Sequence, residues 1–169
     1  MKKLIQGVGY IGEGKYSKYN TKLYLKWETM LTRVYRKGGA KGYEDVIVEE
    51  RWHNYQNFCE DITKMPNYNI KRFALDKDLI LLGNRRYGPD YCSIVPIEFN
   101  FAASAFIKNE KMSIEDRIYY IVDLAERYRS GIEDRVYNTL TSIKPIYFEL
   151  VGLQRKYPES GIFKNNAIN

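Results

Sequence analysis

The chain has 169 residues, of which 44% are hydrophobic, so it is long enough for one domain with a buried core. No apolar run reaches the roughly 18 residues of a membrane span, and the start MKKLIQGVGY lacks the sustained apolar segment of a secretion signal. The two cysteines, Cys59 and Cys92, show neither a disulfide framework nor the spacing of a zinc site. We therefore expect a cytoplasmic protein with no membrane partner.

Positive charge is concentrated at the N-terminal end. Residues 1–43 hold ten Lys or Arg and two acids, a net charge of +8, so the remaining residues carry −2 of the total of +6. Tyrosines are interleaved with these cations, a combination that favours phosphate contacts and base stacking. The alternative is a lysine-rich surface without a partner. The candidate nucleic-acid-binding residues are Lys22, Lys26, Arg33, Arg36, Lys37, Lys41, Arg85 and Arg86.

The first 64 residues predict an irregular arm followed by two helices. Residues 1–20 are basic and rich in glycine and tyrosine, but their glycine spacing matches neither a dinucleotide fingerprint nor a P-loop. Apolar residues recur at helical spacing over 21–35 and again over 49–64, which predicts two amphipathic helices. A short β-prone segment, 46–48, separates them.

The stretch from Leu75 to Asn100, LDKDLILLGNRRYGPDYCSIVPIEFN, follows a different pattern. Residues 73–82 are mostly apolar and predict a strand, and Gly83-Asn84 predicts a turn because both residues tolerate positive φ. A second β-prone run, 93–95, ends at a proline that opens a helix more readily than it continues a strand. The pattern therefore predicts strand, loop, strand and helix.

Oxygen-bearing side chains cluster in this stretch. Asp76, Asp78 and Asn100 carry carboxylate and amide oxygens of the kind that Mg²⁺ or Mn²⁺ prefers. Two short strands followed by a helix, with such groups converging, form the architecture of a one-metal ββα nuclease site. The alternative is a hairpin with a solvated acidic turn, because a pair of aspartates two residues apart is common by itself.

Two further helices are predicted near the C-terminus. Ser113 resembles the first residue of a capping box and opens a helix that extends to about residue 129. A second helix is expected to end before Pro145, because proline disrupts a helix interior. We expect a helical hairpin over 109–153 that is core-forming or makes a dimer contact, and a polar tail over 154–169.

These segments together predict an α+β fold. A small ββα-metal-like hairpin–helix motif is expected among the helices of a domain over 21–108, and the C-terminal helical hairpin follows it. The oligomeric state stays open in this prediction.

The same stretch resembles the signature of phage HNH-like endonucleases of the homing type, which is roughly L-D-K-D-I-L-x-x-G-N-K-x-Y-S-P-x-x-C-x-F-V-P-x-x-I-N. YLKWETMLTRVY and ERWHNYQNF upstream, and LAERYRSGIEDRVYNTL downstream, resemble further segments of that family, so the likeness covers about nine tenths of the chain. The matching signature positions are Leu75, Asp76, Lys77, Asp78, Gly83, Asn84, Tyr87, Pro89, Cys92, Val95, Pro96 and Asn100.

The resemblance implies a metal-dependent endonuclease or nickase that acts on nucleic acid, DNA in the first instance, inside an infected bacterium. It implies that Asp76 and Asn100 hold Mg²⁺ or Mn²⁺. The catalytic residues that it implies are Asp76, Lys77, Asp78 and Asn84.

The chain departs from the family pattern in two respects. It has no Apetala-type DNA-binding module after Asn100, and the segment from Leu75 to Asp78 lacks the histidine with which HNH sites begin. These departures favour a second interpretation, in which the scaffold is catalytically inactive and needs no cofactor. It would then bind nucleic acid or a host protein, as a regulator or as an inhibitor of a host defence nuclease.

Overall fold

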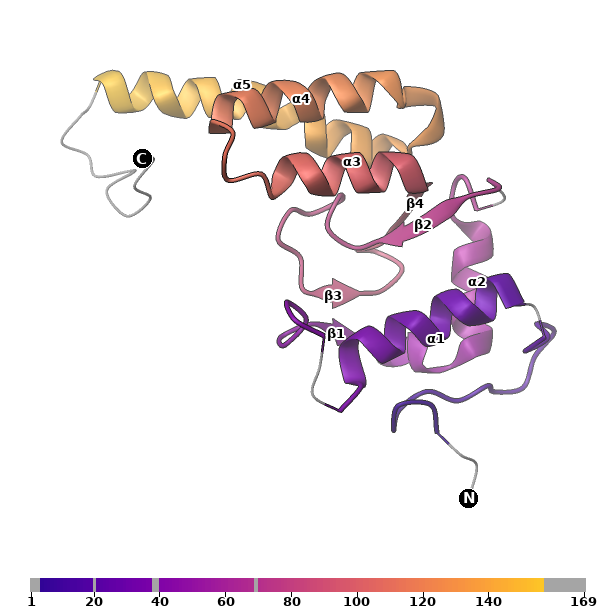
Figure 1. The fold of residues 1–169 in the computed structure, drawn as a ribbon. Helices are drawn as coiled ribbons and strands as arrows, with labels where there is room; N and C mark the ends of the chain where they lie inside the picture. Colours follow the sequence, from indigo (N-terminus) through magenta and orange to yellow (C-terminus); the bar gives the residue numbers. More distant parts are fainter. Residues whose placement is uncertain (1–3, 20, 38–39, 69, 157–169) are drawn as a thin grey trace.

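The computed structural model describes residues 4–19, 21–37, 40–68 and 70–156, and over this part of the chain helices and two small sheets are combined (Figure 1). The α+β class is therefore confirmed. The elements are α1 (Thr21–Tyr35), β1 (Ile47–Val48), η1 (Glu50–His53), α2 (Tyr55–Lys64), β2 (Phe73–Asp76), β3 (Arg86–Tyr87), β4 (Ser93–Pro96), α3 (Ile97–Ile107), α4 (Ile114–Arg127), η2 (Arg129–Gly131) and α5 (Asp134–Lys156).

The antiparallel pair β2–β4 lies between two hydrophobic cores. Because successive residues of a strand face opposite sides, each strand contributes to both cores. Phe73 and Ile94 belong to the first core, while Ala74 and Val95 contact the second. Helices α1 and α2 build the first core and helices α3, α4 and α5 build the second. Sheet β1–β3 is a separate, parallel pair.

The described part of the predicted arm, residues 4–19, packs against the first core. Gly9 passes so close to α1 that an added Cβ would lie 2.4 Å from Cδ1 of Leu31. Tyr10 forms a β-bridge with Asn54, and the indole Nε1 of Trp27 donates a hydrogen bond to the carbonyl oxygen of Trp52 (2.7 Å). The arm therefore covers the core that the two helices form.

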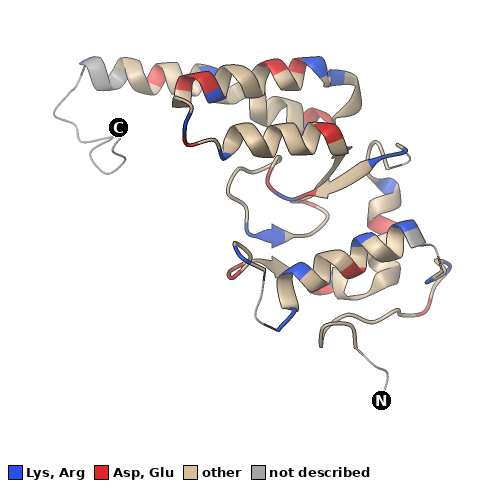
Figure 2. Ribbon diagram, viewed as in Figure 1, with Lys and Arg blue, Asp and Glu red and all other residues tan. Residues whose placement is uncertain are grey.

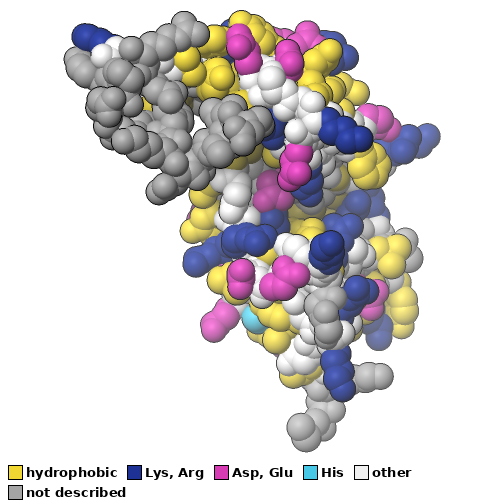
Figure 3. Space-filling view, turned by 60° about the vertical axis from the view of Figure 1, so that its left-hand side comes forward, with side chains coloured by type: hydrophobic (Ala, Val, Ile, Leu, Met, Phe, Trp, Pro, Cys, Tyr) yellow, Lys and Arg dark blue, Asp and Glu magenta, His cyan; other side chains and the backbone are white. Residues whose placement is uncertain are grey.

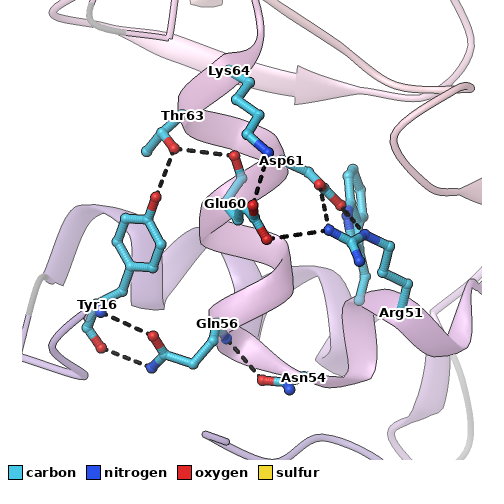
Figure 4. Close-up of polar contacts among 9 residues, drawn as sticks. Tyr16, Arg51, Asn54, Gln56, Glu60, Asp61, Thr63 and Lys64 are labelled. Atoms are coloured by element: carbon cyan, nitrogen blue, oxygen red, sulfur yellow. Dashed lines mark hydrogen bonds and ion pairs between the residues drawn. The ribbon is translucent and has the colours of Figure 1, made fainter. Parts of the chain in front are cut away.

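A polar network fixes α2 to its neighbours (Figure 4). The backbone of Tyr16 exchanges two hydrogen bonds of 2.9 Å with the carboxamide of Gln56. The guanidinium of Arg51 donates two hydrogen bonds to the carboxylate of Asp61 (2.7 and 2.9 Å), and Nε1 of Trp52 donates a third (2.9 Å). Asp61 is thus held by one cation and one buried indole.

The prediction of a single helix over 49–64 is wrong in its first turn. Glu50–His53 is a 3₁₀ turn, and the α-helix begins at Tyr55. Asn54 separates the two, because its backbone is extended (φ −84°, ψ 118°) and its side chain accepts a hydrogen bond from the amide N–H of Gln56 (2.9 Å). An asparagine in this position is an N-cap, which starts a new helix.

The C-terminal helices confirm one prediction and contradict another. Ser113 caps α4, because its hydroxyl accepts a hydrogen bond from the amide N–H of Asp116 (3.0 Å). The second helix, however, does not end before Pro145 but continues through it to Lys156. Helices α4 and α5 pack against each other, and Ile143, just before the proline, packs against the second core, so tertiary contacts support the helix at this point.

Most of the polar tail predicted from residue 154 lies outside the described residues, since only residues up to 156 are described and they belong to α5. None of the helices that the structure describes has an apolar stretch long enough to cross a bilayer.

Candidate functional site

The loop that follows β2 begins where Asp76 turns the chain. One carboxylate oxygen, Oδ1, accepts hydrogen bonds from the backbone N–H groups of Asp78 (2.7 Å) and Leu79 (2.8 Å). This local capture of amides ends the strand at Asp76, so the predicted strand over 73–82 is wrong after its fourth residue. Aspartate side chains favour such turns over continued pairing.

Asn84 closes the same loop. Its Nδ2 donates hydrogen bonds to the carbonyl oxygens of Lys77 and Arg86 (2.7 Å each), and its Oδ1 accepts one from the amide N–H of Arg86 (3.1 Å). Both donors and the acceptor of the carboxamide are therefore engaged within the loop. The catalytic role stays a prediction, and the contacts are those of a residue that fixes the loop.

Lys77 is a buried cation with only 6% of its surface exposed. Its Nζ donates to the carbonyl oxygen of Asn84 (2.9 Å), pairs with the carboxylate of Asp78 and lies over the ring of Tyr43. A buried ammonium group requires such partners, because transfer from water without them is very unfavourable. Lys77 and Asp78 thus form an ion pair next to Asp76 in the sequence.

The environment of Asp76 raises the pKa of its carboxyl group above the ordinary value. Burial contributes most, because it disfavours the charged form, and the negative charge of Asp78 acts in the same direction. The two backbone amides and the charge of Lys77 oppose this effect without cancelling it. The folded chain therefore disfavours the ionised form of the Asp76 carboxyl group.

The two residues predicted to share a metal ion line different cavities. Asp76 lines one of about 380 Å³ together with Asp78 and Arg85, whereas Asn100 lines another of about 410 Å³ between α1 and α3. Among the described residues, no three His, Cys, Asp or Glu side chains are grouped closely enough to hold a metal ion. The site for Mg²⁺ or Mn²⁺ stays a prediction.

The cavity between α1 and α3, here named the α1–α3 cavity, combines positive charge with an apolar wall. The residues that line it are Lys22, Leu25, Lys26, Thr29, Met30, Arg33, Ala74, Leu75, Tyr87, Ile97, Asn100 and Phe101. Three of them are cations and none is acidic. The cations lie on one face of α1, because residues 22 and 26 are one helical turn apart and residues 26 and 33 are two turns apart.

The pKa of Lys26 is lowered from its ordinary value. Burial is the main cause, and the positive charges of Arg33 and Lys22 add to it, because like charges disfavour a further proton. The ammonium groups of Lys22 and Lys26 lie over the ring of Phe73, at 4.4 and 5.0 Å from its centre. Three positively charged side chains therefore line one cavity, and no carboxylate is among its lining residues.

The other predicted nucleic-acid-binding residues are distributed elsewhere. Arg36 shares a second, smaller depression with Arg33, and Lys37 and Lys41 are exposed in the segment after α1. Arg85 and Arg86 each have a partner in the fold. Arg85 donates a hydrogen bond to the carbonyl oxygen of Gly42 (2.9 Å), and Arg86 forms an ion pair with Glu49 at 3.8 Å. The structure thus brings three of the eight predicted cations to one cavity.

Figures 2 and 3 show how charged residues are distributed over the molecule. Lys and Arg recur along α1 and occupy β3 in Figure 2, and Figure 3 shows Lys and Arg side chains gathered across the middle of one face with acidic side chains beside them. The described charges are therefore mixed on this face, and the α1–α3 cavity is distinguished by the cations that line it.

Sequence reasoning missed the second wall of this cavity. Ile97 and Phe101 come from α3, and they face the cations of α1 only because β2 and β4 carry α3 beside that helix. The only histidine of the sequence, His53, is half-buried and contacts Tyr35, with its Nε2 3.2 Å from the Tyr35 hydroxyl. The spacing of residues along one helix cannot reveal which helix packs opposite to it.

Comparison of the chain with protein-family models, with curated proteins and with solved structures finds no match. Function is therefore inferred from the geometry of these cavities and from the residues that line them.

Proposed function

We propose that this protein binds nucleic acid through the α1–α3 cavity. The observation that carries the proposal is the convergence of Lys22, Lys26 and Arg33 on one cavity that no acidic residue lines. A nucleic acid brings one phosphate charge for every nucleotide, and neutralising these charges releases bound counterions. Binding would also relieve the repulsion that lowers the pKa of Lys26.

Several other described cations already have a carboxylate partner. Lys64 pairs with Glu60 at 2.8 Å, and Arg127 pairs with Asp123 at 2.9 Å. A cation that already has a carboxylate at contact distance loses that interaction when it binds a phosphate. Cations without a carboxylate in their cavity gain more from a phosphate, so the α1–α3 cavity is the favoured contact surface.

A fluorescence-anisotropy titration with labelled DNA and RNA oligonucleotides tests the proposal. In the Lys22→Gln/Lys26→Gln/Arg33→Gln variant, the side-chain stems are kept and the charge is removed. We expect affinity to fall at least about tenfold, because three phosphate contacts are lost. A matched variant, Lys64→Gln/Arg127→Gln/Arg129→Gln, removes three cations that are paired with carboxylates and keeps its affinity.

Absence of binding by the unaltered protein would overturn the proposal. The inactive scaffold with a protein partner would then become the favoured interpretation. Equal losses in the two triple variants would instead show that binding depends on overall charge and not on the cavity.

The environment of Asp76 favours a second candidate function, metal-dependent cleavage of nucleic acid. A carboxyl group with a raised pKa in a cavity with Lys77 and Arg85 is typical of a site built for chemistry. In the chain order β2, β3, β4, α3, the paired strands β2 and β4 and the helix that follows them correspond to the arrangement expected of the ββα motif. A bound Mg²⁺ or Mn²⁺ would supply a Lewis acid, and Lys77 or Arg85 would orient the phosphate.

The residues fit such an ion incompletely, because Asp76 and Asn100 line different cavities. Plasmid nicking in Mn²⁺ tests this candidate. Asp76→Asn is the appropriate variant, since its side-chain oxygen can still accept from the amides of Asp78 and Leu79. Cleavage that Asp76→Asn abolishes and the exposed control Asp123→Asn retains supports the function, and equal cleavage by both variants removes it.

A further inference from the structure

The α1–α3 cavity has a charged wall and an apolar wall. Lys22, Lys26 and Arg33 line it from α1, and Asn100 lines it from α3. The side-chain oxygen of Asn100, Oδ1, has no hydrogen-bond partner among the described residues, but it has no exposed surface, so a ligand in the cavity does not reach it.

The residue after Asn100 offers a flat apolar surface at the same cavity. Phe101 is 70% exposed, whereas Phe99, two residues earlier in the same helix, is fully buried. Leu25, 56% exposed, lies on the opposite wall. Single exposed apolar residues are common on proteins, but here two of them line a cavity that three cations also line. Such a surface fits an aromatic ring.

These groups favour a ligand that combines a negative charge with a flat ring. A nucleotide has both. The cavity of about 410 Å³ is within the range of roughly 300–1,000 Å³ that is usual for small-ligand sites. Bases in a duplex are stacked and paired, so their rings and N–H edges are not free to enter a cavity.

We propose that the α1–α3 cavity accepts an unpaired nucleotide, so that the preferred ligand is single-stranded nucleic acid. The base stacks on Phe101, while Lys22, Lys26 and Arg33 contact its phosphates. This inference rests on the proposed function and adds the strand form and the recognition of a base to it.

The test compares three labelled ligands of equal length at one salt concentration: a mixed-sequence single strand, its blunt duplex, and a single strand built of abasic sugar–phosphate units. The first and third ligands carry the same number of phosphates and differ only in their bases. We expect the mixed-sequence strand to bind more tightly than either of the others, by roughly 5- to 100-fold, which is the range of one stacked base.

Phe101→Ala then removes the stacking surface. In this variant the mixed-sequence and abasic strands bind equally, and the affinity for the duplex does not change. Phe148→Ala, which removes a partly exposed aromatic ring from α5 outside the cavity, preserves the difference between the two strands. The comparison of ligands on the unaltered protein needs no variant to fold.

The outcomes separate this inference from the proposed function. Equal binding of the mixed-sequence and abasic strands would overturn the inference but leave phosphate binding intact. Tighter binding of the duplex would do the same. No binding of any ligand would overturn both proposals.

Discussion

Asp61 on α2 and Asp76 at the end of β2 are both partly buried carboxylates, but their surroundings shift their pKa values in opposite directions. Burial alone would raise the pKa of Asp61, but hydrogen bonds from Arg51 and Trp52 outweigh burial and lower it. Burial and the charge of Asp78 raise the pKa of Asp76. The nearest cation to Asp76 in sequence, Lys77, is directed instead to Asp78 and Asn84.

The opposite pKa shifts show that ionised Asp61 stabilises the folded chain, whereas ionised Asp76 destabilises it. Asp61 has strong partners, so its charged form stabilises the native state. Asp76 is held by two backbone amides without a cation of its own, and ionising it costs more in the folded chain than in the unfolded chain. Residues with such costs cluster at functional sites, where they are available to a ligand.

The largest effect is expected from Asp61→Ala. It removes two hydrogen bonds from Arg51 and leaves the indole N–H of Trp52 buried without a partner. We expect the free energy of unfolding to fall by about 2–3 kcal/mol, mostly from the unsatisfied indole, because Arg51 is largely exposed. Thermal melts followed by circular dichroism measure the change.

Glu60→Ala is the control for this prediction. Glu60 contacts Arg51 and Lys64 from the surface, so its loss is expected to change the free energy of unfolding by no more than about 1 kcal/mol. Similar melting temperatures for the two variants would contradict the structural role given to Asp61.

A smaller loss is expected from Asn84→Asp. The new carboxylate cannot donate the hydrogen bonds that Nδ2 makes to the carbonyl oxygens of Lys77 and Arg86. The expected cost is about 1–3 kcal/mol, and the loop over 77–86 becomes more sensitive to limited proteolysis. Unchanged stability together with lost cleavage would instead assign Asn84 to chemistry and not to support of the loop.

Asp76→Asn is expected to have the opposite sign. The amide oxygen keeps the two backbone hydrogen bonds, and the unfavourable buried charge disappears. At pH 7 the variant should therefore unfold at the same urea concentration as the unaltered protein, or at a higher one. A clear loss of stability would show that the charge of Asp76 is favourable in the fold, contrary to the direction of its pKa shift.

The dependence on pH gives the smallest effect and the sharpest contrast. The stability that Asp61 contributes is present above the ordinary pKa of 3.8 and is lost as pH falls through its lower folded value. The cost of Asp76 appears as pH rises from 3.8 through its higher folded value. Urea unfolding between about pH 3 and 7 should therefore show a gain for Asp76→Asn over the unaltered protein that grows with pH.

Asp61→Asn should show a deficit relative to the unaltered protein, which grows as pH rises through the lowered folded pKa of Asp61 and reaches its full size above about 3.8. Parallel curves for the two variants would mean that the two carboxylates have equivalent environments. That result would remove the basis for distinguishing them.

Regular elements were the part of the fold that the sequence could predict. The apolar spacing of α1 and the cap at Ser113 depend on neighbours a few residues away, so they can be recognised without a structure. The breaks at Asn54 and Asp76 could not be recognised in this way. They depend on a side-chain oxygen that accepts a hydrogen bond from a nearby backbone amide, which ends the regular helix or strand at that point. The helix through Pro145 depends on packing against α4.

The candidate site was predictable only along the helix that carries it. Lys22, Lys26 and Arg33 lie on one side of α1 at helical spacing, which the sequence shows directly. Asp76 and Asn100 belong to one continuous motif in the sequence, and yet they line different cavities. Their separation depends on the turn at Asp76 and on the position of α3 after β4, and both are set by tertiary contacts.

The salt dependence of binding tests the central claim most directly. For a single-stranded oligonucleotide, the logarithm of the association constant is measured against the logarithm of salt concentration for the unaltered protein and for Lys22→Gln/Lys26→Gln/Arg33→Gln. Removal of three phosphate contacts should make the slope shallower by about 2, whereas the control Lys64→Gln/Arg127→Gln/Arg129→Gln keeps the slope of the unaltered protein. The same slope in all three proteins would contradict nucleic-acid binding at the α1–α3 cavity.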